Sequence, residues 1–243
     1  MPKNIPLNER IIFALDVPTH EEAMRLIERL DGEIRFFKVG LQLFMAGWFK
    51  TIDALVERGC KVMVDLKFFD IPETVKLAVG QLCGRGVTFA TVHGNDPILR
   101  AAAAAKGDLK ILAVTVLTSF GEEDMRAMGM SGSIADLVLL RSRRALELGC
   151  DGVVASALEA GPLRGELDEN FLIVTPGIRP GANIDDGSDD QKRIATAKNA
   201  ILSGADYVVI GRPIRDSKDP VALIRSLQQE IAEGLAGRNR LSV

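Results

Sequence analysis

The sequence predicts a (β/α)8 barrel, the TIM-barrel fold, formed by one domain over residues 1–243. Short β-branched runs alternate with longer helix-like segments along the whole chain, and this alternation favours a parallel sheet. Several of the runs are continuously apolar, as strands covered on both faces are. The length of 243 residues is close to the ~250 typical of such barrels. A doubly wound open sheet is the alternative, but no GxGxxG follows the first strand.

The elements are expected in strict alternation. In chain order, strands are predicted at residues 10–16, 36–40, 61–66, 87–93, 110–117, 152–155, 171–175 and 207–210. Helices are predicted at residues 21–30, 42–58, 72–85, 97–106, 134–148, 157–166, 189–203 and 220–235.

The local sequence supports these assignments. The predicted strands are short runs in which apolar and β-branched residues dominate, whereas the predicted helices are amphipathic. Glycine often follows a predicted helix, as at Gly59 and Gly149, because it tolerates the left-handed conformation of a helix end. The long irregular segment 177–190 follows the seventh strand, and its length makes it a candidate lid.

Composition excludes several classes of function. The chain is 47% hydrophobic and 26% charged, with a net charge of −3 and no basic block before its last residues, so we expect no nucleic-acid partner. The longest apolar runs are far too short to span a bilayer, and no membrane association is expected. Three widely spaced cysteines are typical of reduced thiols in a cytoplasmic protein. The chain has only two histidines and no CxxC, so we expect no metal.

The most informative stretch is Asp-Leu-Lys-Phe-Phe-Asp-Ile-Pro-Glu-Thr, residues 65–74, at the end of the third strand. Residues two apart on a strand share a face, so Asp65 and Lys67 should point the same way. Pro72 suits the first turn of a helix, which leaves Asp70 in the connecting loop. Charges are rarely buried unless they are paired, and this array at the end of a strand indicates a site for proton chemistry.

This decapeptide resembles the signature of the orotidine 5′-phosphate decarboxylase family in its bacterial type. Further blocks match in family order at residues 13–16, 37–40, 91–94, 116–119, 175–180, 190–193 and 210–214. The resemblance implies decarboxylation of orotidine 5′-monophosphate to UMP, the last step of de novo pyrimidine synthesis, without a cofactor. It also implies a homodimer, in which Asp70, Ile71 and Thr74 reach the active site of the neighbouring subunit.

Four residues are the expected catalytic groups: Lys67, Asp65, Asp70 and Lys38. Lysine is protonated at neutral pH, and flanking carboxylates favour that charged form. The resemblance implies that the Lys67 ammonium stabilises negative charge at C6 of the pyrimidine and then protonates it. Asp65 and Lys38 would complete an alternating charge network, while Asp70 would either destabilise the substrate carboxylate or position Lys67. A salt bridge with only a structural role is the simpler alternative.

The remaining candidates are substrate-binding residues. Asp16 and Lys38 would bind the ribose, and Thr118 and Ser119 the amide edge of the pyrimidine. Loops after the last two strands of barrels frequently bind phosphate, and glycine followed by arginine suits an anion. The full predicted binding set is Asp16, Lys38, Ile71, Thr74, Thr118, Ser119, Arg179, Gln191, Gly211 and Arg212. The role of His93 is left open.

Two other functions compete with this prediction. Sugar-phosphate decarboxylases and synthases of the same superfamily share the Asp-x-Lys-x-x-Asp run but use magnesium, which they bind with an acidic residue on the second strand. Here that strand carries Lys38, which repels a cation. A catalytically silent phosphate-binding barrel is the second alternative, but none of the expected catalytic residues is missing.

Overall fold

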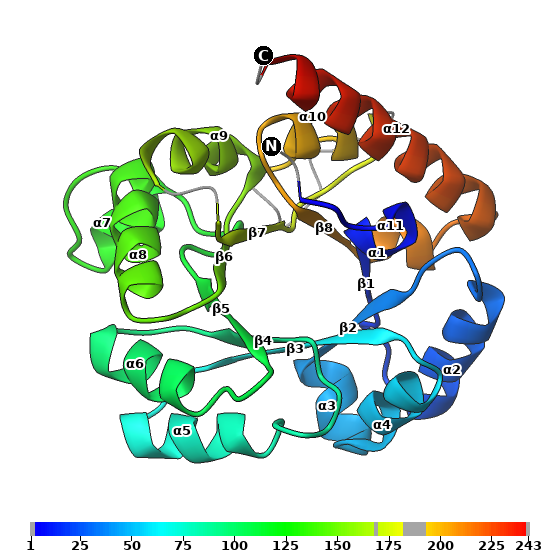
Figure 1. Ribbon diagram of the computed structural model, residues 1–243, viewed down its shortest axis with the longest axis horizontal. Coiled ribbons are helices and arrows are strands. Elements are labelled where there is room, and N and C mark those ends of the chain that lie inside the picture. The colour runs from blue at the N-terminus through cyan, green and yellow to red at the C-terminus, as the bar shows by residue number, and fades with distance from the viewer. Residues whose placement is uncertain (1–2, 168–169, 182–192, 242–243) are drawn as a thin grey trace.

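The structure is a closed barrel of eight parallel strands, and this confirms the predicted fold. The computed structural model describes residues 3–167, 170–181 and 193–241. The strands follow chain order around the barrel, and the helices form a ring outside it (Figure 1). The strands are β1 (Ile11–Ala14), β2 (Phe36–Gly40), β3 (Lys61–Phe68), β4 (Phe89–Val92), β5 (Lys110–Val114), β6 (Gly152–Val154), β7 (Leu172–Thr175) and β8 (Tyr207–Ile210).

The helices cover the outer face of this barrel. They are α1 (Leu7–Arg10), α2 (His20–Arg29), α3 (Leu41–Gly47), α4 (Lys50–Glu57), α5 (Pro72–Gly80), α6 (Asp96–Ala104), α7 (Glu122–Ala127), α8 (Ile134–Glu147), α9 (Ala157–Glu166), α10 (Ala197–Leu202), α11 (Arg212–Arg215) and α12 (Pro220–Leu241). Pro72 is the first residue of α5, as predicted. Among the described residues, no helix combines the length and apolar character that a membrane span needs.

Four predicted helices differ from the structure by more than two residues, and one of them, predicted at 72–85, ends at Gly80. The helix predicted at 42–58 is two helices, because Trp48 adopts a left-handed φ of 47° that ends α3. The helix predicted at 189–203 is wrong over residues 193–196, because the Thr196 side chain caps α10 and starts it at Ala197. Its first residues, 189–192, lie outside the described part of the chain. The last helix is longer than predicted and continues to Leu241.

Strand alternation divides the barrel interior into two layers. The lower layer is an apolar cluster in which Phe36, Phe89 and Tyr207 pack with ring centroids 5.0–5.6 Å apart. Two residues further along β2, the side chain on the same face is Lys38, and the register pairs Lys38 with Met63 and Gly40 with Asp65. The apolar layer therefore supports a charged layer at the carboxyl ends of the strands.

β3 is irregular where the charged layer begins. It continues to Phe68, beyond the predicted end at residue 66, and its register with β4 shifts between Val64 and Phe68. Lys67 has a φ of 48°, a left-handed conformation that is uncommon outside glycine. Such conformations persist only where the surrounding structure enforces them, and they cluster at functional sites.

Candidate active site

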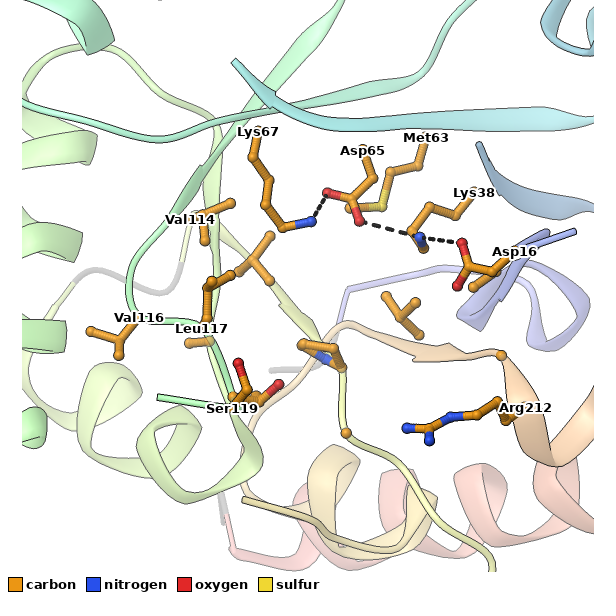
Figure 2. Close-up of a pocket in the computed structure, with 18 of the residues that line it drawn as sticks. Asp16, Lys38, Met63, Asp65, Lys67, Val114, Val116, Leu117, Ser119 and Arg212 are labelled. Carbon is orange, nitrogen blue, oxygen red and sulfur yellow. Dashed lines mark hydrogen bonds and ion pairs between the residues drawn. The ribbon is translucent and has the colours of Figure 1, made fainter. Parts of the chain in front are cut away.

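A cavity of about 260 Å³ opens at the carboxyl ends of the strands (Figure 2). Its floor and walls come from the ends of most strands, so residues far apart in sequence meet there. Nine residues that the sequence predicted as site residues line it: Asp16, Lys38, Asp65, Lys67, Thr118, Ser119, Arg179, Gly211 and Arg212. The volume is near the lower end of the ~300–1,000 Å³ usual for small-molecule sites.

Four of these residues form a continuous chain of alternating charge. The Nζ atom of Lys38 lies 3.2 Å from Asp16 Oδ1 and 3.3 Å from Asp65 Oδ2. The other oxygen of Asp65 lies 2.9 Å from the Nζ atom of Lys67 (Figure 2). Asp65 and Lys67 therefore do point the same way. Asp16 is half exposed at one end of the chain, and Lys67 reaches the cavity at the other.

The charges in this chain depend on one another. Burial would raise the pKa of Asp65, but the positive charges of Lys38 and Lys67 outweigh it and hold that pKa below its ordinary value. Burial would likewise lower the pKa of Lys38, but Asp65 and Asp16 keep it above the ordinary lysine value. Both residues are therefore charged at neutral pH.

Thr91 fixes the irregular end of β3. Its hydroxyl donates to Asp65 Oδ1 at 2.8 Å and accepts from the backbone N–H of Lys67 at 3.0 Å. One fully buried side chain thus orients the Asp65 carboxylate and holds the left-handed backbone of Lys67. Sequence analysis missed this residue, although it lies on β4 two residues after Phe89, which faces the barrel interior.

A second group of polar residues lies at the ends of β7 and β8, with Arg212 on the side of the cavity away from Lys67 (Figure 2). The backbone of Ala195 holds residues 177–179. Its N–H donates to the Gly177 carbonyl at 3.1 Å, and its carbonyl accepts from the N–H of Arg179 at 2.9 Å. Gly211 has little room for a side chain, since a Cβ atom there would meet the Cβ of Ala14 at 3.3 Å. Arg212 follows it and is exposed, separated from Lys67 by the width of the cavity (Figure 2). Glycine and arginine together suit a bound anion.

The wall between these groups comes from the segment after β5. Val114, Val116 and Leu117 give it an apolar surface, and Thr118 and Ser119 add hydroxyl groups. Thr118 is buried, whereas Ser119 is exposed. An apolar wall with a polar edge suits a flat heteroaromatic ring.

The other predicted residues lie elsewhere. Asp70, Ile71 and Thr74 are exposed on the loop after β3 and at the start of α5, and they do not line the cavity of their own chain. The carboxylate of Asp70 accepts from the N–H of Ile71 at 2.6 Å. Gln191 and most of the predicted lid at 177–190 lie outside the described residues.

His93, whose role the sequence left open, does not line the cavity. Its Nδ1 atom lies 3.1 Å from the carbonyl oxygen of Val114, and its ring packs edge-on against Phe69 at 5.6 Å. These contacts give it a structural role at the ends of β4 and β5. Among the described residues, no three His, Cys, Asp or Glu side chains cluster as metal ligands would.

The chain is similar to known proteins over most of its length. The model of the "Orotidine 5'-phosphate decarboxylase / HUMPS family" matches residues 9–227. The chain is 53% identical to orotidine 5'-phosphate decarboxylase of Methylococcus capsulatus over 96% of both chains. It is 45% identical to the enzyme of that name from Stenotrophomonas maltophilia, over 95% of this chain and 96% of the relative. The crystal structure of orotidine 5'-phosphate decarboxylase from Lactobacillus acidophilus superimposes with a TM-score of 0.80 at 34% identity, covering 92% of this chain and 99% of that one.

Proposed function

Because the chain belongs to the orotidine 5′-phosphate decarboxylase family, we propose that it converts orotidine 5′-monophosphate to UMP and carbon dioxide. The reaction supplies UMP for pyrimidine synthesis. One observation carries the mechanism: the alternating chain Asp16–Lys38–Asp65–Lys67 lines the same cavity as Arg179 and Arg212, with Lys67 and Arg212 on different sides of it (Figure 2). A charged catalytic group and an anion-binding group are thus set apart by the width of one cavity.

Lys67 is the proposed proton donor. When the bond between C6 and the carboxylate breaks, carbon dioxide leaves and the electron pair stays on C6. The Lys67 ammonium stabilises this negative charge and then delivers its proton, which forms the C6–H bond of UMP. Solvent afterwards returns a proton to the neutral amine.

Asp65 and Lys38 are the proposed supports of that step. The Asp65 carboxylate holds the Lys67 side chain in the cavity, since it lies 2.9 Å from Nζ. Lys38 keeps Asp65 ionised in its buried position. These side chains hold one another through direct ion pairs, and such preorganised charges reduce the reorganisation needed during a reaction.

The distant groups would bind the rest of the nucleotide. We assign the phosphate to Gly211, Arg212 and Arg179, the ribose to Asp16 and Lys38, and the amide edge of the pyrimidine to Thr118 and Ser119. Gln191 is proposed to reach the pyrimidine or the phosphate. Binding energy from the non-reacting phosphate can be used to organise the charged site, which matters for a decarboxylation that has no electron sink.

The active unit is proposed to be a homodimer. Asp70, Ile71 and Thr74 are exposed in the single chain, and Ile71 leaves 66% of its surface open to solvent. In the dimer these residues would contribute to the neighbouring cavity, with Asp70 placed beside the substrate carboxylate and Lys67. Each barrel is proposed to act as one domain.

We also assign the enzyme to the cytoplasm. Cys60, Cys83 and Cys150 are all free thiols in the structure. Free, partly or fully buried cysteines fit a reducing compartment.

The test follows the ultraviolet absorbance of orotidine 5′-monophosphate with purified protein in excess EDTA. Wild type should consume the substrate and Lys67→Ala should not, because the proton donor is lost. Lys61→Ala is the matched control, since Lys61 lies on the same strand at the other end of the barrel and should stay active. No reaction with folded wild-type protein would reject the proposal and direct the search to sugar phosphates with magnesium.

A further inference from the structure

Arg193 has no role in the mechanism above, yet its side chain is almost buried and forms an ion pair and two hydrogen bonds. Its guanidinium forms an ion pair with Glu159, and the two side chains are only 10% and 9% exposed. The same guanidinium donates to the carbonyl oxygens of Val116 at 3.1 Å and Leu117 at 2.8 Å. Arg193 therefore joins three segments that are distant in sequence.

The two carbonyls lie in the segment that follows β5, where the chain leaves the sheet. β5 ends at Val114, and Thr115 is the last residue of this segment that bonds β6: its N–H and its hydroxyl donate to the Val154 carbonyl at 3.3 and 2.9 Å. The carbonyl oxygen of Thr115 accepts a hydrogen bond from Arg141 of α8 at 2.6 Å. The carbonyl oxygens of the next two residues, Val116 and Leu117, accept from Arg193. Arginine side chains thus bond the carbonyls of three consecutive residues, which are followed directly by Thr118 and Ser119.

Arg193 is itself held in place. Glu159 lies in the first turn of α9, where its other oxygen accepts from the N–H of Ser156 at 2.8 Å and from the Ser156 hydroxyl. The carboxylate is therefore tied to the start of a helix, and the planar guanidinium can donate to both carbonyls at once. A lysine would keep the charge beside Glu159 but would lack this forked geometry.

We propose that Arg193 is a positioning residue for the nucleobase: it holds the backbone before Thr118 and Ser119 so that their polar groups meet the pyrimidine edge. The inference rests on the proposed function, because it assigns Thr118 and Ser119 to a pyrimidine. It predicts that losing Arg193 weakens recognition of the base while leaving recognition of the ribose phosphate unchanged.

The chain offers a matched control in Arg164. This buried arginine pairs with Asp206 at 2.7 Å and donates to the carbonyls of Gly204 and Phe171 at 3.0 and 2.9 Å. It makes the same kinds of bond as Arg193 but at the opposite end of the barrel, before β7 and β8. If replacing a buried arginine weakens ligand binding only by loosening the fold, then the lysine variants of Arg193 and of Arg164 should both show the loss.

The experiment measures by calorimetry the affinity of wild type, Arg193→Lys and Arg164→Lys for UMP and for ribose 5-phosphate, which lacks the base. In Arg193→Lys the Kd for UMP should rise about tenfold, the effect of losing about one hydrogen bond. The Kd for ribose 5-phosphate should stay within about twofold in both variants, and Arg164→Lys should bind both ligands as wild type does. If circular dichroism shows that Arg193→Lys is unfolded, Arg193→Gln is used and should show the same base-selective loss.

Equal losses for both ligands, or no loss for either, would overturn the role of Arg193. Wild type is assayed for decarboxylation in parallel, so that the two proposals fail separately. A wild type that neither decarboxylates orotidine 5′-monophosphate nor binds UMP overturns the proposed function and this inference with it. A wild type that does both, with no base-selective loss in the variants, overturns the inference alone.

Discussion

Replacing Lys38 by methionine tests whether the charge network also stabilises the fold. The substitution keeps an unbranched apolar side chain that reaches as far as Cε and removes the ammonium group. Lys38 is 10% exposed and contacts Asp65, which is 12% exposed, and Asp16, which is 49% exposed. The substitution therefore leaves the buried Asp65 carboxylate without one of its compensating positive charges, whereas water can solvate the Asp16 carboxylate.

The size of the loss follows from the geometry. At 3.3 Å, two unit charges attract by about 5 kcal/mol at an effective dielectric constant of about 20. Removing one partner of a buried pair destabilises proteins by about 3–5 kcal/mol. Asp65 retains Lys67 and the Thr91 hydroxyl, so we expect the lower end, about 3 kcal/mol of unfolding free energy.

Urea unfolding at neutral pH measures this free energy. Lys61→Met is the control, since Lys61 pairs with Glu9 at 2.6 Å at the more exposed end of β3. That substitution should lower the unfolding free energy by less than about 1 kcal/mol. The denaturant midpoint of Lys38→Met should fall well below that of Lys61→Met, with unchanged slopes.

The difference between wild type and Lys38→Met should also depend on pH. The pKa of Asp65 is depressed in the folded state, so its stabilising effect is present above the ordinary value of 3.8 and is lost as pH falls through the folded pKa. The pKa of Lys38 is raised, so its effect is present below 10.5 and is lost as pH rises through the folded pKa. The difference in unfolding free energy between wild type and Lys38→Met should be largest between pH 3.8 and pH 10.5, and it should shrink at lower and at higher pH. A loss no larger than that of Lys61→Met, or one independent of pH into the acid range, would refute the reasoning.

Two further substitutions test other parts of the site. Thr91→Val removes the hydroxyl between Asp65 and Lys67 and should lower the unfolding free energy by about 1–3 kcal/mol in urea titrations, along with catalytic efficiency. Thr175→Val should change neither by much, because the equally buried Thr175 hydroxyl has no hydrogen-bond partner among the described residues. Arg212→Ala should lower kcat/KM by roughly 10- to 100-fold, since a hydrogen bond to a charged group contributes about 1.5–3 kcal/mol. Its melting temperature should not change, because Arg212 is exposed, and wild-type efficiency in this variant would contradict a phosphate role.

The sequence predicted well what depends on local pattern. Alternation along β3 placed Asp65 and Lys67 on one face, and Pro72 marked the start of α5. These features follow from strand geometry and from the backbone limits of proline. The barrel itself follows from the repeated alternation of strands and helices.

What the sequence missed depends on contacts between distant segments. The irregular end of β3 is stabilised by Thr91 from the next strand, a contact that no period within β3 reveals. Likewise, Arg193 and Glu159 are 34 residues apart and meet only once the barrel has closed. The start of α10 was an avoidable error, because Thr196 before a run of helix-forming residues is a capping signal.

The arrangement of the barrel explains why a strained, highly charged site is tolerated at all. The aromatic layer of Phe36, Phe89 and Tyr207 closes the barrel beneath the charges, so the charged layer is not needed to fill the core. Above it, every charge between Asp16 and Lys67 touches one of opposite sign, and the left-handed backbone of Lys67 is held by a hydrogen bond from a neighbouring strand. Burying such a chain of charges gains little stability over an apolar layer of the same size. The stability that the apolar layer supplies therefore permits Lys67 to be held in a conformation whose use is chemical.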